Sequence, residues 1–341
     1  MNLLKAELRR LAKRRITRWM LLLVLLLMPT VALVVASNYV KPGPAAQAQA
    51  EAAAAAEFER QQVYIEAEVA RCEADQAAGT ADEMGWPEDC EEIRAWQSSQ
   101  EEMVEWFMPP AFEFREDFQP MIKVLTALLC LFGFTIGASF VGAEWRTGGM
   151  MNLLLWRPRR LQVLGTKLAA LVGVLAGLAV VLGALWTGMF WLVAEFRGIT
   201  DTMTDGAWQS FGLAGLRGLA LVLFAGVLGF ALASIGRHTA LAMGAAIVAF
   251  VVGVAGVGII GGGMLELPFY ERWIWSTYVT AWLDGSVELT DWNAPCTPTP
   301  NGDCVSPTLE ISWQIAGIGM AVLFAVVLIV AMWQMRQRDV A

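Results

Sequence analysis

Charge is scarce in this chain of 341 residues: only 16% are Asp, Glu, Lys or Arg, whereas 57% are hydrophobic. Histidine occurs once, at His238. Mean hydropathy is +0.52, and the hydrophobic share exceeds that of ordinary soluble domains. These scarcities argue against a soluble globular enzyme and indicate a polytopic membrane protein.

Charged residues are missing from the interior of six long runs rich in Leu, Val, Ala and Gly. A helix needs about 20 apolar residues to cross a bilayer, and the alternation that a membrane β-barrel requires is absent. We therefore predict an all-α polytopic membrane protein with an N-terminal amphipathic helix and a helical external loop. Its six transmembrane helices are expected at 19–40, 118–143, 167–194, 217–236, 239–265 and 311–335.

Basic residues mark one side of these spans. Most Lys and Arg fall in the N-terminal segment, the second and fourth connections and the C-terminal tail, whereas most of the 32 acids fall in the other connections. The positive-inside rule then places both termini in the cytoplasm. Cytoplasmic segments are expected at 1–18, 144–166, 237–238 and 336–341, and external ones at 41–117, 195–216 and 266–310.

The first span also has the parts of a cleavable signal peptide, including the small residues Ala36 and Ser37. We favour an uncleaved anchor, because residues 1–18 have helical periodicity and are expected to form an amphipathic interfacial helix. The external segment 41–117 is acidic and has the Ala, Glu and Gln composition of helices. A partly disordered acidic loop is the alternative.

Five cysteines divide between the expected compartments. Cys72 and Cys90 lie in the first external segment, Cys296 and Cys304 in the last, and Cys130 within the second span. The simplest pairing joins Cys72 to Cys90 and Cys296 to Cys304, although four cysteines permit three pairings. Metal binding is disfavoured because histidine is absent nearby and no Cys-x-x-Cys occurs.

Aromatic residues and glycines add two expectations. Trp273, Trp275 and Trp282 gather just after the fifth span, in a segment too polar to cross the membrane, and this indicates an interfacial or re-entrant helix. The glycines Gly261–Gly263 are a plausible hinge. Glycines elsewhere in the spans are interpreted as close helix packing within one subunit.

Several kinds of chemistry are missing. Ion-coupled transport is disfavoured because the span interiors lack ionisable groups. Gly165-Thr166-Lys167 is not a nucleotide-binding loop, which requires Gly-x-x-x-x-Gly-Lys-Ser/Thr. An intramembrane enzyme remains a weak alternative, since its candidates Glu195, Glu310 and His238 are single groups at span edges or turns.

The cytoplasmic segment after the second span carries the most specific pattern. Its elements are Glu144, a Thr147-Gly148 turn, the apolar stretch Met150–Leu155, Pro158 with Arg160, and Lys167. In this order they resemble the coupling loop of type-2 ABC transporter permeases. On the residues alone, an amphipathic membrane-surface helix flanked by positive-inside arginines explains the segment equally well.

The resemblance extends to the N-terminal helix and the six spans, and it implies the membrane subunit of an ATP-driven exporter, which we expect in the plasma membrane. The largely uncharged spans suggest an apolar or amphipathic substrate. ATP and Mg²⁺ would bind a separate ABC ATPase, so no cofactor, no enzymatic activity and no nucleic acid are expected on this chain. A second copy or a related permease would complete the pathway. Small members of this family have a short connection after the first span, whereas in this chain the long segment 41–117 stands there. The residues expected to couple to the ATPase are Glu144, Arg146, Met150, Leu153, Leu154, Pro158 and Arg160.

A structural or signalling membrane protein, whose acidic external loop binds a partner, is the alternative from a different class.

Overall fold

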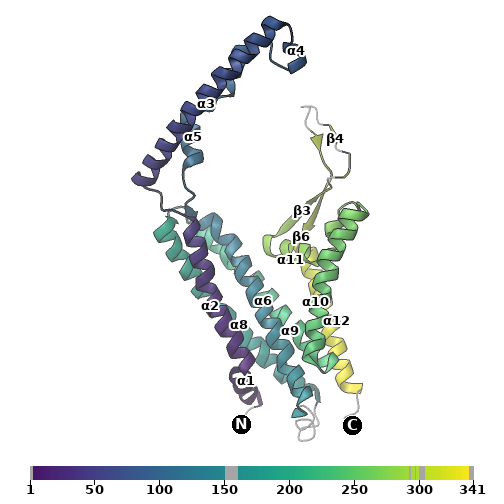
Figure 1. The fold of residues 1–341 in the computed structure, drawn as a ribbon. Helices are drawn as coiled ribbons and strands as arrows, with labels where there is room; N and C mark the ends of the chain where they lie inside the picture. The colour runs from purple at the N-terminus through teal and green to yellow at the C-terminus, as the bar shows by residue number, and fades with distance from the viewer. Residues whose placement is uncertain (1–2, 150–159, 292, 296, 299–303, 338–341) are drawn as a thin grey trace. The chain divides into compact units, whose positions relative to one another are not determined.

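The structure is a computed structural model that describes residues 3–149, 160–291, 293–295, 297–298 and 304–337. Six of its helices are long and apolar enough to cross a membrane, which confirms the predicted fold class. The chain forms two compact units: unit 1 is 1–30, 118–188 and 203–341, and unit 2 is 31–117 and 189–202. Figure 1 shows both in ribbon form.

Unit 1 is a helix bundle. It contains α1 (Leu3–Lys13), α9 (Asp205–Gly236), α10 (Thr239–Phe250), α11 (Trp275–Asp284) and α12 (Trp313–Gln337), together with most of three helices that continue into unit 2. Those three are α2 (Arg15–Asn38), α6 (Phe114–Arg146) and α8 (Arg160–Arg197). Both α1 and the C-terminal end of α12 lie at the same end of unit 1 (Figure 1).

Glycines bring α6 and α9 into direct backbone contact at the centre of this bundle. A Cβ on Gly137 would overlap the carbonyl oxygen of Gly226, and one on Gly229 would overlap that of Phe134. Small residues permit such close approach of helices in membranes. The expected close packing of glycines within one subunit therefore accounts for these three positions.

Helix α10 continues from Val251 to Met264 as two π-helical segments, Val251–Gly256 and Gly258–Met264. The Trp275 indole donates to the carbonyl of Ala249 at 3.3 Å, and its ring lies against Gly253. Helix α11 lies in the segment where an interfacial or re-entrant helix was expected, and it follows a short 3-10 helix at Tyr270–Trp273.

A hairpin precedes α12. Strand β3 (Ser286–Thr290) pairs antiparallel with β6 (Thr308–Ser312), and the short strands β4 (Thr297–Pro298) and β5 (Cys304–Val305) extend it. Apolar side chains from the hairpin and the two adjacent helices form a small core of Ala281, Leu289, Ile311 and Ala316. Ile311 and Ser312 thus belong to a strand, and the last span begins two residues after the position predicted for it.

Helix starts also differ from expectation for the third and fourth spans. Helix α9 begins at Asp205, inside the stretch 195–216 predicted to be a loop, because the Thr204 hydroxyl caps it by accepting from the Ala207 amide at 3.3 Å. Helix α8 begins at Arg160, so Lys167 lies two turns inside the helix rather than at its start.

Unit 2 consists mainly of the long helix α3 (Pro44–Ala78), with α4 (Ala81–Met84), a 3-10 helix at Cys90–Trp96 and α5 (Gln100–Phe107). Proline in the first turn starts α3, and Gly79, with φ of 74°, ends it in the left-handed conformation. A capping box between Ser99 and Glu102 starts α5. Strands β1 (Phe112–Glu113) and β2 (Gly198–Ile199) pair in parallel.

A disulfide joins Cys72 of α3 to Cys90, with the two Cα atoms 5.8 Å apart. Around it pack Ile65, Val69 and Ile93. The Cys72–Cys90 pairing is the local one that the sequence favours. Cys304 is also disulfide-bonded, whereas Cys296 lies outside the described residues.

Candidate functional site

The N-terminal helix α1 packs on the bundle through Leu11 and Glu7, which are four residues apart and share one face. Leu11 is fully buried, and Glu7 is 1% exposed. Leu4, which the periodicity assigns to the apolar side, is instead 42% exposed. A carboxylate at the centre of the buried face needs a cationic partner, because an unpaired buried charge is costly.

Lys167 of α8 supplies that partner. Its ammonium group is fully buried and lies 2.7 Å from the Glu7 Oε2 atom and 2.8 Å from the Glu144 Oε2 atom. It also lies over the Phe140 ring, 4.8 Å from the centroid. One lysine therefore joins a carboxylate of α1 to a carboxylate at the end of α6.

Arg14, between α1 and α2, completes the network on the other side of Glu144. Its Nη2 atom lies 3.0 Å from the Glu144 Oε1 atom, and its Nη1 atom donates to the Ser139 carbonyl at 2.6 Å. Burial lowers the pKa of the Arg14 guanidinium, and the adjacent Glu144 carboxylate opposes this change. The group stays protonated, as arginine does throughout the physiological range.

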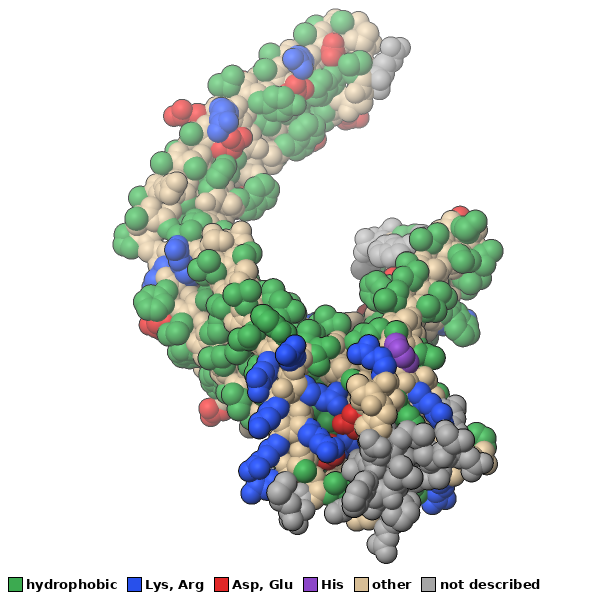
Figure 2. Space-filling model, turned by 60° about the horizontal axis from the view of Figure 1, so that its bottom comes forward, with side chains coloured by type: hydrophobic (Ala, Val, Ile, Leu, Met, Phe, Trp, Pro, Cys, Tyr) green, Lys and Arg blue, Asp and Glu red, His purple; other side chains and the backbone are tan. Residues whose placement is uncertain are grey.

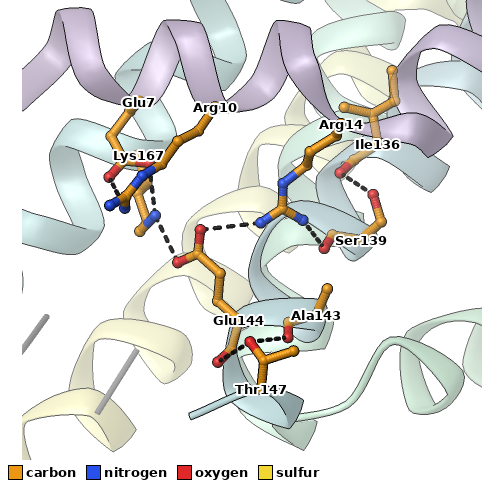
Figure 3. A network of polar contacts seen from close by, with 9 residues as sticks. All are labelled: Glu7, Arg10, Arg14, Ile136, Ser139, Ala143, Glu144, Thr147 and Lys167. Atoms are coloured by element: carbon orange, nitrogen blue, oxygen red, sulfur yellow. Dashed lines mark hydrogen bonds and ion pairs between the residues drawn. The ribbon is translucent and has the colours of Figure 1, made fainter. Parts of the chain in front are cut away.

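We call Glu7, Lys167, Glu144 and Arg14 the charge network (Figure 3). Two carboxylates alternate with two cations, so its formal charges cancel. Arg10 adds an exposed contact, with its Nη1 atom 3.1 Å from the Glu7 Oε1 atom. Figure 2 shows Lys and Arg side chains gathered over the end of the molecule that carries α1.

Beyond Glu144, helix α6 ends in a tight turn. The Thr147 hydroxyl donates to the Ala143 carbonyl at 3.0 Å (Figure 3), and Gly148 has φ of 72°. The left-handed conformation at Gly148 is the one that glycine adopts without strain. The Thr147-Gly148 turn therefore releases the chain from α6 within four residues of the charge network.

A contact to α10 braces the same end of α6. Gly142 approaches Thr239 so closely that a Cβ there would overlap the Thr239 hydroxyl. Arg237 lies over the Trp145 ring at 4.9 Å, and the His238 ring accepts from the Ala240 amide at 3.1 Å as the cap of α10. His238 thus has a structural role as a helix cap.

The predicted coupling residues have different outcomes. Glu144 lies in the charge network, whereas Arg146 is exposed to solvent. Arg160 is the first residue of α8. Met150, Leu153, Leu154 and Pro158 lie outside the described residues, as does the rest of the predicted coupling helix.

Two members of the network, Glu7 and Arg14, were missed by sequence reasoning. Glu7 does carry a signal, because it is the single acid among residues 1–18. Lys167 was noticed as part of the motif but was not expected to be buried. Among the described residues, no group of three or more His, Cys, Asp or Glu side chains could hold a metal ion.

An apolar cavity of about 780 Å³ opens further along the bundle, among α6, α9, α10, α11 and α12. Its walls include Cys130, Phe134, Phe224, Trp275 and Met320. Lys123 also lines it, and its ammonium group is 2.7 Å from the Asp284 carboxylate. The volume falls in the range of small-molecule sites.

These features define a polytopic helical membrane protein whose N-terminal helix is joined by buried charges to the two helices that flank the segment 150–159. The family model for ABC-2 family transporter proteins matches residues 1–274, and the chain belongs to this family. It is thus a transmembrane transporter subunit, and the family implies an ABC ATPase partner. Neither the comparison with curated proteins nor that with solved structures gives a match.

Proposed function

We propose that this chain is the membrane subunit of an ATP-driven exporter in the plasma membrane, with both termini in the cytoplasm. A separate ABC ATPase docks on the segment 150–155 and on α1, and two copies of the chain, or one copy with a related permease, form the pathway. ATP and Mg²⁺ bind the ATPase. The ABC-2 family match and the basic residues at the α1 end support this arrangement.

The charge network is the observation that carries the proposal. Glu144 stands before the segment 150–159 and Lys167 stands after it, and their side chains are in contact at 2.8 Å. Both also connect to α1, through Glu7 and Arg14. A force applied to the segment by a closing ATPase is therefore transmitted at once to α1, α6 and α8, because buried ion pairs resist separation.

The cargo is proposed to be an apolar or amphipathic molecule. The cavity among α6, α9, α10, α11 and α12 supports this, because its walls are almost entirely apolar and include the charged side chain of Lys123. A molecule with an apolar body and a polar end matches that distribution.

Co-purification in mild detergent tests the docking step. We expect an ABC ATPase to be retained in one-to-one ratio, and the double variant Leu153→Asp, Leu154→Asp to release it, because charges replace the apolar contact. Val63→Asp, at a 73% exposed position of α3, is the matched control and should retain the ATPase. A chain that purifies alone after gentle crosslinking contradicts the proposal.

The transmission step needs a second variant. Glu144→Gln keeps the size of the side chain and removes its charge, so we expect the ATPase to remain bound while ATP hydrolysis is no longer stimulated by cargo. If the chain is instead a structural or signalling protein whose external loop binds a partner, Glu144→Gln leaves partner binding unchanged. Deletion of residues 44–107 then abolishes partner binding.

A further inference from the structure

A cleft of about 610 Å³ lies between α3 and α5, within unit 2. The buried stripe of α3 consists of Ala46, Ala50 and Ala54 and then resumes at Ile65, Val69 and Cys72. Between these two parts, the same face presents Glu57, Gln61 and Tyr64. Helices α3 and α5 lie side by side (Figure 1), whereas Ile65, Val69 and Cys72 pack against the 3-10 helix at Cys90–Trp96, so the cleft lies between these two contacts of α3.

Aromatic side chains wall the cleft and remain largely open to solvent. Trp106 is 81% exposed, Tyr64 is 63% exposed and Phe107 is 42% exposed. Met103, which is 5% exposed, forms its floor. Large aromatic residues contribute most of their free energy when buried, so an exposed aromatic cleft of small-molecule volume indicates a ligand.

The charge of the surrounding helices selects the kind of ligand. The basic residues of 44–107 are Arg60, Arg71 and Arg94. Each is already paired within unit 2: Arg60, which also lines the cleft, with Glu57 at 2.7 Å, Arg71 with Glu68 at 2.9 Å, and Arg94 with Glu66 and Glu91. The remaining carboxylates of 44–107 therefore give this part of unit 2 a negative potential, which attracts cations and repels anions.

We propose that the cleft between α3 and α5 binds an amphipathic organic cation, whose apolar body fills the cleft and whose charge lies against the aromatic rings. Cations are attracted to the faces of Trp and Tyr, and quaternary ammonium groups are recognised in this way. The proposal rests on the proposed function for one point, namely that α3 and α5 lie outside the membrane, where such a molecule enters or leaves.

An aromatic patch beside a membrane can instead anchor a protein in lipid headgroups. The exposed carboxylates of Glu101 and Glu105, on the same short helix as Trp106, oppose this role, because helices that bind a membrane surface carry Lys and Arg on their polar face. The same charges favour a cationic ligand. Charge complementarity therefore selects the small cation over the membrane surface.

Binding is tested with the full chain in nanodiscs, using methyltriphenylphosphonium as the probe and the neutral triphenylphosphine oxide as its matched analogue. Equilibrium dialysis against empty nanodiscs subtracts partition into lipid. We expect saturable binding of the cation, about tenfold weaker binding of the neutral analogue, and about tenfold weaker cation binding by Trp106→Ala. Trp96→Ala, at a 62% exposed tryptophan outside the cleft, should bind like the unchanged chain.

A charge variant provides an independent readout. Glu101→Gln with Glu105→Gln should weaken cation binding and reduce its dependence on salt, because part of the attractive potential is removed. Thiol labelling detects whether the Cys72–Cys90 disulfide is intact and so verifies that unit 2 has folded in each variant.

Equal binding by Trp106→Ala and the unchanged chain overturns the inference, as does equal binding of the charged and neutral probes. Quenching of Trp106 by brominated lipids without cation binding assigns the cleft to the membrane surface, and crosslinks between two copies at Trp106 assign it to a dimer. Retention of the ATPase is measured on the same preparations. Absence of cation binding with the ATPase retained refutes this inference alone.

Discussion

Substitution of Lys167 by methionine gives the sharpest test of the charge network. Methionine fills a similar volume but removes the ammonium group that lies 2.7 Å from the Glu7 carboxylate, which is 1% exposed and then keeps only its contact to the exposed Arg10. Removal of one partner of a buried ion pair costs about 3–5 kcal/mol. The α1 helix can relieve this cost by leaving its site, because undocking returns Glu7 to water. We therefore expect Lys167→Met to shift α1 towards an undocked state.

Thiol labelling measures this shift. Leu11 is fully buried, so the thiol of the variant Leu11→Cys is protected from labelling while α1 is docked. The additional change Cys130→Ala removes the free thiol within the second span. When docking equilibrates faster than labelling, the rate follows the open population. Since 1.4 kcal/mol corresponds to a factor of ten, Lys167→Met should accelerate labelling by roughly two to three and a half orders of magnitude.

Two controls separate the network from a general loss of charge. Lys123→Met removes another ion pair, with Asp284, but Lys123 is 39% exposed and a pair of this kind contributes about 0–1 kcal/mol. It should leave the labelling rate unchanged. Glu7→Gln combined with Lys167→Met removes both charges of the pair and should recover most of the protection. An unchanged rate in Lys167→Met alone would refute the reasoning.

Two further predictions concern the two units separately. Gly137→Leu should abolish monodisperse protein in detergent chromatography, because its Cβ overlaps the Gly226 carbonyl oxygen, whereas Gly177→Leu, with open space around its Cβ position, should behave like the unchanged chain. Equal yields would contradict the close packing of α6 on α9. Replacing Cys72 and Cys90 by alanine should destabilise unit 2 by about 3 kcal/mol, because the disulfide closes a loop with a sequence separation of 18. Limited proteolysis of α3 should then accelerate, and reducing agent should reproduce this in the unchanged chain.

The number and type of the spans followed from the sequence because lipid imposes a simple rule, namely about 20 residues without charge. The same rule misplaced the start of α9, because Arg217 was treated as the edge of a span. In the structure, Arg217 lies within the helix. Its guanidinium donates to the Leu283 carbonyl at 3.3 Å and lies over the Trp313 ring at 5.6 Å. These partners are distant in sequence, so no local pattern reveals them.

The charge network was only half predictable for a similar reason. Glu144 was expected from its place in the loop motif, and the motif also included Lys167. Glu7 and Arg14 required knowledge that α1 packs against α6 and α8, over sequence separations of 130 and 160 residues. The periodicity of 1–18 indicates an amphipathic helix but does not say whether lipid or protein covers its inner face. One carboxylate among basic residues was the available signal.

The presence of buried charges under α1 itself favours a mechanical role over a stabilising one. An apolar contact surface of equal area would keep α1 docked about as well, since buried ion pairs add little net stability over well-packed apolar residues. Apolar contacts, however, are non-directional, whereas charge-assisted hydrogen bonds have a specific geometry. The contacts of Lys167 at 2.7 and 2.8 Å are made in one register only. A one-turn shift of α1, about 5.4 Å, would break the contact between Lys167 and Glu7, and Lys167 would keep only its contact to Glu144. We therefore expect α1, α6 and α8 to move together as one rigid body, which apolar packing alone would not ensure.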